Sequence, residues 1–278
     1  MFDGTAFSLD KVFFICLNSS MNITIAGYGF VGKAYASLLE SSYNITIVDP
    51  GYPEHDIPIP KDTDAIIICV ATPQDADGSC DMSNVFNVLE NTPNVPILIK
   101  STISLGGWQG IANCFIVGVR EVLDITFSPE FLRAETAHKD LMELEELYLG
   151  GSNVAFWTDI FKKCYQSEIN VLTMSVKELI LIKYFRNAFL ATKVNFFNQV
   201  YDLCEAAHIN YDNVALGIGM DTRIGNSHTK VNTERGFGGH CFPKDTLAIV
   251  NTAKSLDVSL SLINESINYN KVIRKDNV

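Results

Sequence analysis

The sequence predicts an α/β protein with a doubly wound sheet at residues 21–174, followed by an all-helical second domain at residues 175–278 built on one long spine helix. In the first region, short β-branched runs alternate with amphipathic stretches, the pattern of strands joined by crossover helices. After Ser175, neither glycine nor proline occurs before Gly217, so we expect one helix of about thirty residues. A chain of 278 residues is also near the size at which one core divides into two domains.

The first strand is expected at Asn22–Ala26, and a glycine motif follows it before a helical pattern begins. Strand, glycine motif and helix in this order are typical of the Rossmann dinucleotide-binding unit. Its glycines allow a tight turn and let a pyrophosphate approach the backbone at the helix N-terminus. The residues of the motif are Gly27, Tyr28, Gly29, Phe30, Val31 and Gly32.

A carboxylate follows the second expected strand. Asn44–Val48 reads as that strand and Asp49 comes directly after it, about twenty residues beyond the glycine motif. An acidic side chain there accepts hydrogen bonds from ribose hydroxyls and repels a 2′-phosphate. We therefore expect NAD as the cofactor rather than NADP, with a solvated strand-end cap as the less favoured interpretation of Asp49.

Open α/β sheets bind ligands at the carboxyl ends of their strands. Further strands are expected at 64–70, 95–100, 116–119, 123–127, 146–151 and 169–173, with helices at 82–90 and 153–165. By itself Glu130 would be interpreted as an ordinary loop carboxylate. The residues at strand ends, and therefore the candidates for the ligand site, are Thr72, Pro73, Ser101, Thr102 and Glu130.

The spine helix opens with a capping box, since Ser175 is followed three residues later by Glu178. Lys183 and Asn187 stand four residues apart on it and share a face. Their neighbours are almost all apolar, so we expect the helix to be buried on most sides. Because an unpartnered buried lysine is costly, Lys183 either extends to the surface or faces a polar cavity beside Asn187; we favour the cavity.

The most informative stretch is Arg235–Asp245, in which a glycine-rich loop leads directly into Cys241. Pro243 suits the first turn of a helix expected at 243–256, which places the thiol just before a helix N-terminus with Lys244 nearby. Both the helix dipole and an ammonium favour the thiolate. A cysteine after glycines is often only a small buried apolar residue. The conjunction of glycines, cysteine, proline, lysine and aspartate favours a nucleophile.

Composition excludes several classes of function. A net charge of -11 and a pI of about 4.9 argue against a nucleic-acid partner. Seven cysteines without regular spacing argue for a reducing, cytoplasmic location and against a disulfide framework or a bound metal. No apolar run reaches the roughly 20 residues that span a bilayer, so no membrane role is expected. Residues 1–20 are interpreted as an N-terminal extension, either loosely packed or the product of a start codon assigned too far upstream.

These motifs together resemble the UDP-glucose/GDP-mannose dehydrogenase family, most closely its UDP-glucose 6-dehydrogenase branch. The resemblance covers residues 21 to about 275 and rests on motifs in a fixed order. They are GYGFVG at 27–32, Asp49, ATP at 71–73, KST at 100–102, SPEFLR at 128–133, KxxxN at 183–187, NAFLA at 187–191, GMDTRIG at 219–225 and GFGGHCFPKD at 236–245.

The resemblance implies NAD-dependent, four-electron oxidation of a nucleotide sugar, UDP-glucose above all, from the C6 alcohol to the uronic acid. Cys241 would add to the intermediate aldehyde, because a second hydride leaves only from a tetrahedral carbon. Lys183 and Asn187 would stabilise the oxyanion. Glu130 would act through water in the final hydrolysis, with Thr102 and Asp245 holding that water or the general base. The residues implied to contact the sugar nucleotide are Glu130, Phe131, Leu132, Arg133, Lys183, Asn187, Phe237, Gly238, Gly239 and, from a neighbouring subunit, Arg223.

The chain departs from the family pattern in three places. His240 precedes the cysteine as in relatives that oxidise N-acetylated sugars, whereas Lys244 matches the UDP-glucose branch. The second carboxylate of the SPEFLR segment, Glu135, is shifted by one position. Relatives continue beyond the helix expected at 258–273 into a domain that grips the nucleotide, whereas this chain ends at Val278. We therefore expect weak activity from the chain alone, unless a separate polypeptide supplies that domain.

Three alternative functions stay open. A UDP-N-acetylhexosamine dehydrogenase would differ only in its sugar. A β-hydroxyacid dehydrogenase shares the Rossmann domain and a Lys-xxx-Asn pair but needs no thiol. A catalytically weakened NAD-binding protein would keep the fold alone. The apolar spine helix predicts a homodimer, or else a cover formed by residues 1–20.

Overall fold

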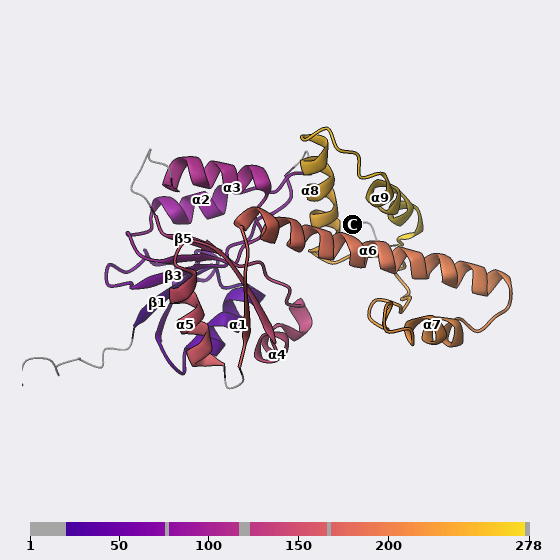
Figure 1. Ribbon diagram of the computed structural model, residues 1–278, viewed down its shortest axis with the longest axis horizontal. Helices are drawn as coiled ribbons and strands as arrows, with labels where there is room; N and C mark the ends of the chain where they lie inside the picture. Colours follow the sequence, from indigo (N-terminus) through magenta and orange to yellow (C-terminus); the bar gives the residue numbers. More distant parts are fainter. Residues whose placement is uncertain (1–20, 76–77, 117–122, 166–167, 276–278) are drawn as a thin grey trace, which may run out of the picture.

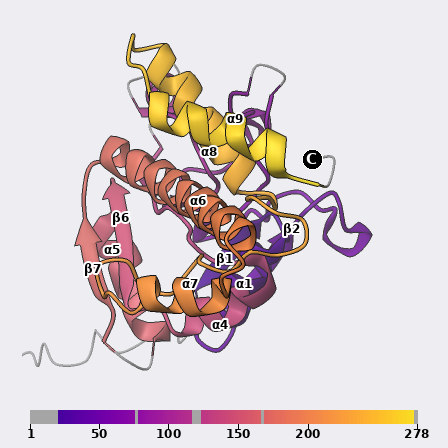
Figure 2. The same cartoon turned by 90° about the vertical axis from the view of Figure 1, so that its right-hand side faces the viewer.

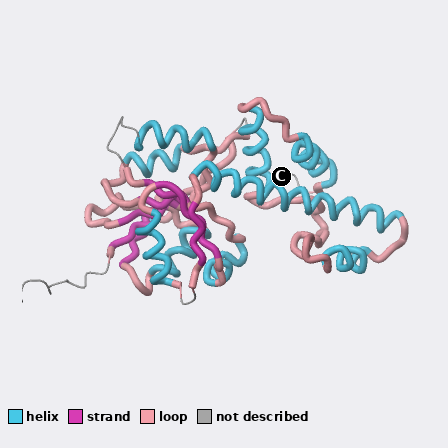
Figure 3. Tube along the Cα trace, in the orientation of Figure 1, coloured by secondary structure: helices cyan, strands magenta, loops and turns pink. Residues whose placement is uncertain are grey.

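The computed structural model describes residues 21–75, 78–116, 123–165 and 168–275. They form a seven-stranded sheet with helices on both faces, and the long helix α6 (Val176–Ala206) runs from this layered part into a group of further helices (Figure 1). Figure 3 shows the same division, with the strands confined to one end of the molecule. The predicted fold class is confirmed. The interpretation of residues 1–20 concerns residues outside the described part of the chain.

The strands follow the order β2-β1-β3-β4-β5-β6-β7 across the sheet. The first five in this order are mutually parallel, so their carboxyl ends lie along one edge, while β6 runs antiparallel to β5 and β7 is parallel to β6. Their bounds are β1 Asn22–Ala26, β2 Asn44–Val48, β3 Ala65–Ile68, β4 Ile97–Ile99, β5 Ile125–Phe127, β6 Glu146–Gly151 and β7 Asn170–Thr173.

One predicted strand is wrong where it can be judged. Ile116 ends a π-helix, η2 (Ala112–Ile116), rather than starting a strand, and residues 117–122 lie outside the described part. The π-helix directly continues α3 (Leu105–Ile111), and Phe115 within it is buried in the core. An apolar run of this length is compatible with either a buried strand or a buried helical turn, and periodicity does not separate the two.

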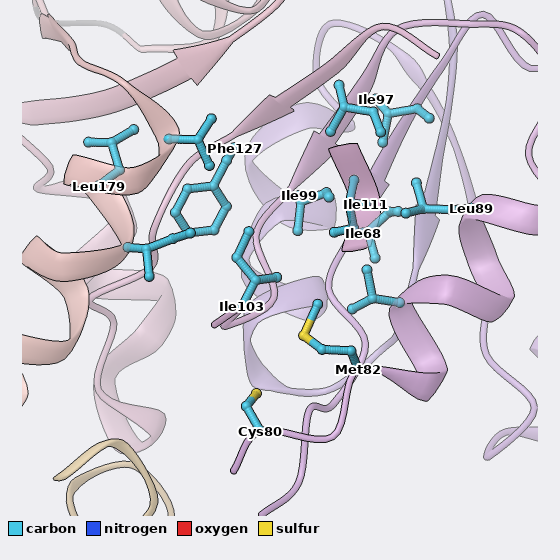
Figure 4. Packing of buried hydrophobic residues seen from close by; sticks show 14 of the residues in the cluster. Ile68, Cys80, Met82, Leu89, Ile97, Ile99, Ile103, Ile111, Phe127 and Leu179 are labelled. Carbon is cyan, nitrogen blue, oxygen red and sulfur yellow. The ribbon is translucent and has the colours of Figure 1, made fainter. Parts of the chain in front are cut away.

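Successive strand residues point to opposite faces, and each face carries its own core. Ile66 and Ile68 face α2 (Ser83–Glu90), α3 and the start of α6, the packing seen in Figure 4. On the other face, Ile67 packs with fully buried side chains of α1 (Phe30–Leu39) and α5 (Val154–Cys164). The helix α4 (Ala137–Met142) covers the same face next to α1. Short 3-10 turns, η1 (Pro53–His55) and η3 (Ala134–Thr136), complete this part.

The helix α6 begins as predicted. Ser175 accepts a hydrogen bond from the Glu178 N–H and the Glu178 carboxylate accepts one from the Ser175 N–H, which completes the capping box. Beyond the sheet, α6 is flanked by α8 (Phe242–Lys254) and α9 (Ser261–Ile273) on one side and α7 (Tyr211–Gly219) on the other (Figure 2).

The predicted burial of α6 on most sides is wrong. Phe189 is 67% exposed and Phe185 41% exposed, although both belong to the apolar stretch that suggested burial. Large apolar side chains continue along the helix at Phe196 (54%) and Leu203 (71%). Since these positions recur at helical spacing, α6 presents one apolar face that the described residues leave uncovered.

Candidate active site

A cleft of about 1080 Å³ opens at the carboxyl ends of the parallel strands. Its walls come from the loops after β1, β2, β3, β4 and β5 and, opposite them, from the glycine-rich loop and the first turn of α8. Lys183 of α6 also lines it. The cleft therefore lies between the sheet and the helical region, where the sequence places both a dinucleotide motif and a candidate nucleophile.

The glycine motif fits a phosphate-bearing ligand. Gly27 has a φ of +98°, and a Cβ there would lie 2.6 Å from the backbone of Cys69 and Val70. A Cβ on Gly32 would lie 1.9 Å from the carbonyl oxygen of Gly27. Gly29 also lines the cleft, but it differs because its Cβ would meet nothing within 4 Å. No side chain caps the N-terminus of α1, so its backbone N–H groups are left for a ligand in the space next to Gly29.

Asp49 lies on the same wall, directly after β2. One oxygen accepts a hydrogen bond from the Tyr28 N–H over 2.6 Å and the other accepts one from the Gly51 N–H over 2.8 Å. The two backbone donors hold the carboxylate in place at the margin of the cleft beside Tyr52. A carboxylate fixed next to the glycine motif is what recognition of an adenosine ribose requires.

Glu130 is buried after β5, and its carboxylate accepts from four donors. One oxygen accepts from the N–H groups of Phe131 (2.7 Å) and Leu132 (3.1 Å). The other accepts from the Tyr35 hydroxyl at 2.9 Å and pairs with the Lys100 ammonium at 3.1 Å. Burial would raise the pKa of Glu130, but Lys100, Tyr35 and the Phe131 N–H outweigh it and hold this pKa below its usual value.

Lys183 is buried, as expected for a lysine facing a cavity, and lines the cleft together with Cys241. Its ammonium donates a hydrogen bond to the backbone carbonyl of Glu130 and lies 5.5 Å from the centre of the Phe131 ring. The side chain is therefore held by the segment after β5. The Lys183 ammonium does not need to extend to the surface, because the carbonyl and the ring offset part of the free-energy cost of burying it.

Asn187 and Asp245 form a buried pair close to Cys241. The Asn187 amide donates to one Asp245 oxygen over 2.6 Å, and the Lys244 ammonium pairs with the other at 2.8 Å. Asp245 is 1% exposed. Its N–H donates to the carbonyl of Cys241, so the carboxylate stands one turn after the thiol on α8.

Two thiols line the cleft, and they differ in environment. Burial raises the pKa of the Cys69 thiol to about 12, which keeps it protonated and unreactive. Cys241 is partly exposed at the N-cap position of α8, and its side chain accepts no capping hydrogen bond. Pro243 occupies the first turn, as predicted. Of the two, Cys241 is the candidate nucleophile.

The glycine-rich loop is held from outside the cleft. The Phe237 N–H donates to the Asn270 side chain over 2.7 Å, and the Asn270 amide donates back to the Phe237 carbonyl over 2.9 Å. Asn198 of α6 accepts from the Gly236 N–H over 3.1 Å. A Cβ on Gly238 would lie 2.2 Å from the guanidinium of Arg274. The loop that carries Cys241 is thus fitted against α6 and α9.

The structure brings most of the expected residues together but not all. Besides Arg133 and Arg223, the expected residues that do not line the cleft are Tyr28, Gly32, Phe131, Asn187, Phe237, Gly238 and Asp245. Arg133 is paired with Asp140, and Arg223 is paired with Asp221 and 86% exposed. Glu135 lines a second hollow of about 560 Å³ next to Lys33. The residues that do line the cleft are Gly27, Gly29, Phe30, Val31, Asp49, Thr72, Pro73, Ser101, Thr102, Glu130, Leu132, Lys183, Gly239 and Cys241.

Lys100 and Tyr35 were not predicted as site residues. The sequence offered one signal for Lys100, a lysine directly after an apolar strand in the KST motif, where burial is expected on both faces. Within the described ranges, no helix is long and apolar enough to cross a bilayer. The same residues contain no group of three or more histidine, cysteine or acidic side chains placed to hold a metal.

Comparison with known proteins agrees with this geometry. Residues 54–169 match the NAD binding domain of the UDP-glucose/GDP-mannose dehydrogenase family, and residues 177–272 match its central domain. A UDP-glucose 6-dehydrogenase of Rhizobium meliloti is 33% identical over 221 residues, which are 75% of this chain and 50% of that protein. One from Rickettsia bellii is 33% identical over 222 residues, 76% of this chain and 50% of that protein. The chain spans about half the length of the curated relatives it matches.

Solved structures share the fold. A UDP-glucose dehydrogenase from Pyrobaculum islandicum superposes with a TM-score of 0.77 at 25% identity, covering 92% of this chain and 69% of that one. A UDP-D-ManNAc dehydrogenase from Pyrococcus horikoshii gives 0.75 at 20% identity, covering 91% and 69%. Because both domain models match in order and the relatives align over most of the sequence, the chain belongs to the UDP-glucose/GDP-mannose dehydrogenase family and contains its NAD-binding and central domains.

Proposed function

We propose that this protein oxidises the C6 alcohol of a nucleotide sugar to the uronic acid with NAD as the oxidant, and that UDP-glucose is the substrate. One observation carries the proposal: Cys241 and Lys183 face the same cleft as the glycine motif and Asp49. A single hydride transfer would need no thiol, so a nucleophilic cysteine in a dinucleotide cleft favours the four-electron reaction.

NAD would lie along the glycine motif and Asp49, and when bound it supplies a hydride acceptor. The first oxidation converts the C6 alcohol to an aldehyde. The Cys241 sulfur then adds to the aldehyde carbon as a thiohemiacetal, whose oxidation leaves a thioester. The oxygen on that carbon becomes negative, and Lys183 and Asn187 are the donors proposed to stabilise it. Water releases the acid and returns the thiol; Glu130 would act through this water, with Thr102 and Asp245 holding it.

His240 is relevant to which sugar is the substrate. It lines the cleft next to Cys241, and a histidine at this position resembles the relatives that oxidise N-acetylated sugars. A UDP-N-acetylhexosamine is therefore the second candidate substrate. Arg133 and Arg223, the cations expected to contact the nucleotide, are each held in an ion pair within this chain. A separate polypeptide that contributes to nucleotide binding remains part of the proposal.

We further propose a homodimer formed through the exposed apolar face of α6. Phe185, Phe189, Phe196 and Leu203 repeat along one side of this helix over several turns. A second copy of the same face would remove these side chains from water. Light scattering on the protein and on a chain that begins at Met21 tests this. If removing residues 1–20 turns a monomer into a dimer, those residues covered the face instead.

The decisive experiment follows NADH formation with UDP-glucose, UDP-N-acetylmannosamine and GDP-mannose, using the native protein, Cys241→Ser and the control Cys164→Ser. We expect two NADH per sugar from the native protein and from the control, which alters a partly buried thiol on α5. Cys241→Ser should form no uronic acid. Full turnover by Cys241→Ser would favour a single-hydride dehydrogenase. Binding of NAD without turnover of any sugar would favour a binding protein.

A further inference from the structure

Lys100 is a buried cation that the reaction outlined above leaves without a role. It follows β4 directly, and its side chain is 1% exposed although it lines the cleft wall. The ammonium donates to the Ser128 hydroxyl over 2.9 Å and to the Pro129 carbonyl over 3.4 Å, and pairs with the Glu130 carboxylate at 3.1 Å. It lies 4.9 Å from the centre of the Tyr35 ring. Three successive residues after β5 are therefore held by one side chain.

The Glu130 carboxylate in turn organises the backbone that follows it. It accepts from the N–H groups of Phe131 and Leu132, which points both amides inward toward one oxygen. This leaves the Glu130 carbonyl directed at α6, where it accepts the hydrogen bond from Lys183. A protonated carboxyl has one oxygen that donates, so it satisfies these four donors less well than the anion does.

We propose that Lys100 is a positioning residue that holds the Glu130 carboxylate as an anion and, through the Glu130 carbonyl, sets the place of the Lys183 ammonium in the cleft. The inference rests on the proposed function, because it assigns Lys183 to the reacting carbon. The Lys100 ammonium is occupied by Ser128, Pro129 and Glu130, so Lys100 is not assigned a contact with the substrate. Its effect reaches the cleft through Glu130 and the backbone at 130–132.

Besides Lys100, several titratable groups of the described residues lie near the Glu130 carboxylate. Tyr35 approaches from α1, Cys69 from the end of β3, Tyr165 from the end of α5 and Lys183 from α6. Burial keeps the pKa values of the Tyr35, Cys69 and Tyr165 side chains above their ordinary values, so these groups stay neutral near pH 7. Lys183 bonds the carbonyl rather than the carboxylate. Lys100 is thus the cation that pairs directly with Glu130.

Lys100→Met tests the proposal by keeping most of the unbranched apolar part of the side chain and removing its charge. With the cation gone, burial dominates and the pKa of Glu130 rises above its unfolded value. The anion then destabilises the fold, so the melting temperature should lie below that of the native protein at pH 8. The gap should narrow as pH falls and Glu130 takes up a proton. Turnover should move in the opposite direction, falling about tenfold per pH unit below the new pKa.

If Lys100→Met only lost packing, lowering the pH would not both narrow the melting gap and reduce turnover. Lys177→Met, an exposed lysine near the start of α6, is the matched control and should follow the native protein in both measurements. Lys100→Met/Glu130→Gln removes the titrating carboxyl. Its melting gap should therefore not depend on pH. An equal melting gap at every pH in Lys100→Met, with a native pH profile of turnover, would overturn the proposal.

Failure of a variant to fold, or absence of turnover in the native protein, also bears on the proposal. If Lys100→Met does not fold, folding of Lys100→Met/Glu130→Gln supports the coupling, because the second change removes the buried uncompensated charge. Failure of both variants to fold would contradict it. If the native protein oxidises no nucleotide sugar, the proposed function fails, yet the pH dependence of the melting temperature still tests the tie between Lys100 and Glu130.

Discussion

Asn187 donates a hydrogen bond to Asp245 over 2.6 Å and so ties the long helix α6 to the first turn of α8, one turn beyond Cys241. The two residues are 58 positions apart in the chain. The bond joins the residue expected to stabilise the oxyanion to the helix whose N-terminus carries the thiol. Any change in the packing of α6 against α8 therefore reaches the cleft.

Replacing Asp245 by Asn should reduce both stability and turnover. The substitution leaves the Lys244 ammonium, which is 18% exposed, without its carboxylate. Breaking a buried pair in this way costs about 3 kcal/mol. We expect a lower melting temperature and a loss of turnover of about a hundredfold. Glu265→Gln, an exposed acid on α9, should change neither. Native turnover in Asp245→Asn would remove Asp245 from the proposed mechanism.

The glycines of the motif should respond differently to alanine. A Cβ on Gly29 enters open space in the cleft, so Gly29→Ala should fold normally and bind NAD at least about tenfold more weakly. A Cβ on Gly32 collides with the Gly27 carbonyl at 1.9 Å, so Gly32→Ala should lose thermal stability as well. Calorimetric titration with NAD beside thermal melting separates the two effects. Undiminished NAD binding by Gly29→Ala would place the pyrophosphate elsewhere.

Asp49→Asn should weaken the preference for NAD. The amide oxygen still accepts one backbone hydrogen bond, but the negative charge that repels a 2′-phosphate is lost. We expect NAD to bind about tenfold more weakly and NADP more tightly than before. Asp159→Asn, on the exposed side of α5, serves as the control. An unchanged ratio of NAD to NADP affinity would mean that Asp49 only caps the strand.

Asn270→Ala should loosen the loop that carries Cys241. Two hydrogen bonds between Asn270 and the backbone of Phe237 disappear, and the Phe237 N–H is left without its acceptor, at a cost of about 2 kcal/mol. We expect a lower melting temperature and slower NADH formation, while NAD affinity is kept. Asn264→Ala, exposed on the same helix, is the comparison. Equal behaviour of the two variants would show that the loop holds its shape without α9.

Much of the local structure was predictable because it is encoded over short distances. The capping box at Ser175 and the absence of glycine and proline beyond it predict a long helix, and α6 ends at Ala206 close to the expected length. Strand, glycine motif and helix likewise follow one another in the chain as they do in space. The error at Ile116 has a local cause as well, since a short apolar run does not distinguish a strand from a buried helical turn.

The exposed face of α6 and the role of Lys100 could not be predicted from the sequence. Phe189 is apolar in either environment, and only the arrangement of α7, α8 and α9 decides which side of α6 they leave open. Lys100 looks like a strand-end lysine until β5 brings Ser128, Pro129 and Glu130 to its ammonium. Those contacts depend on the order of strands in the sheet.

The sequence by itself determined the fold class, the dinucleotide motif and the residue types required for the proposed chemistry, because periodicity, caps and glycine positions act within a few residues. The tertiary structure decided which of these residues share a cleft. It placed Cys241 and Lys183 there with the glycine motif and kept Arg133 and Arg223 in ion pairs outside it. The physical reason is that side chains distant in the chain meet only when the sheet order and the packing of α6 against α8 are established.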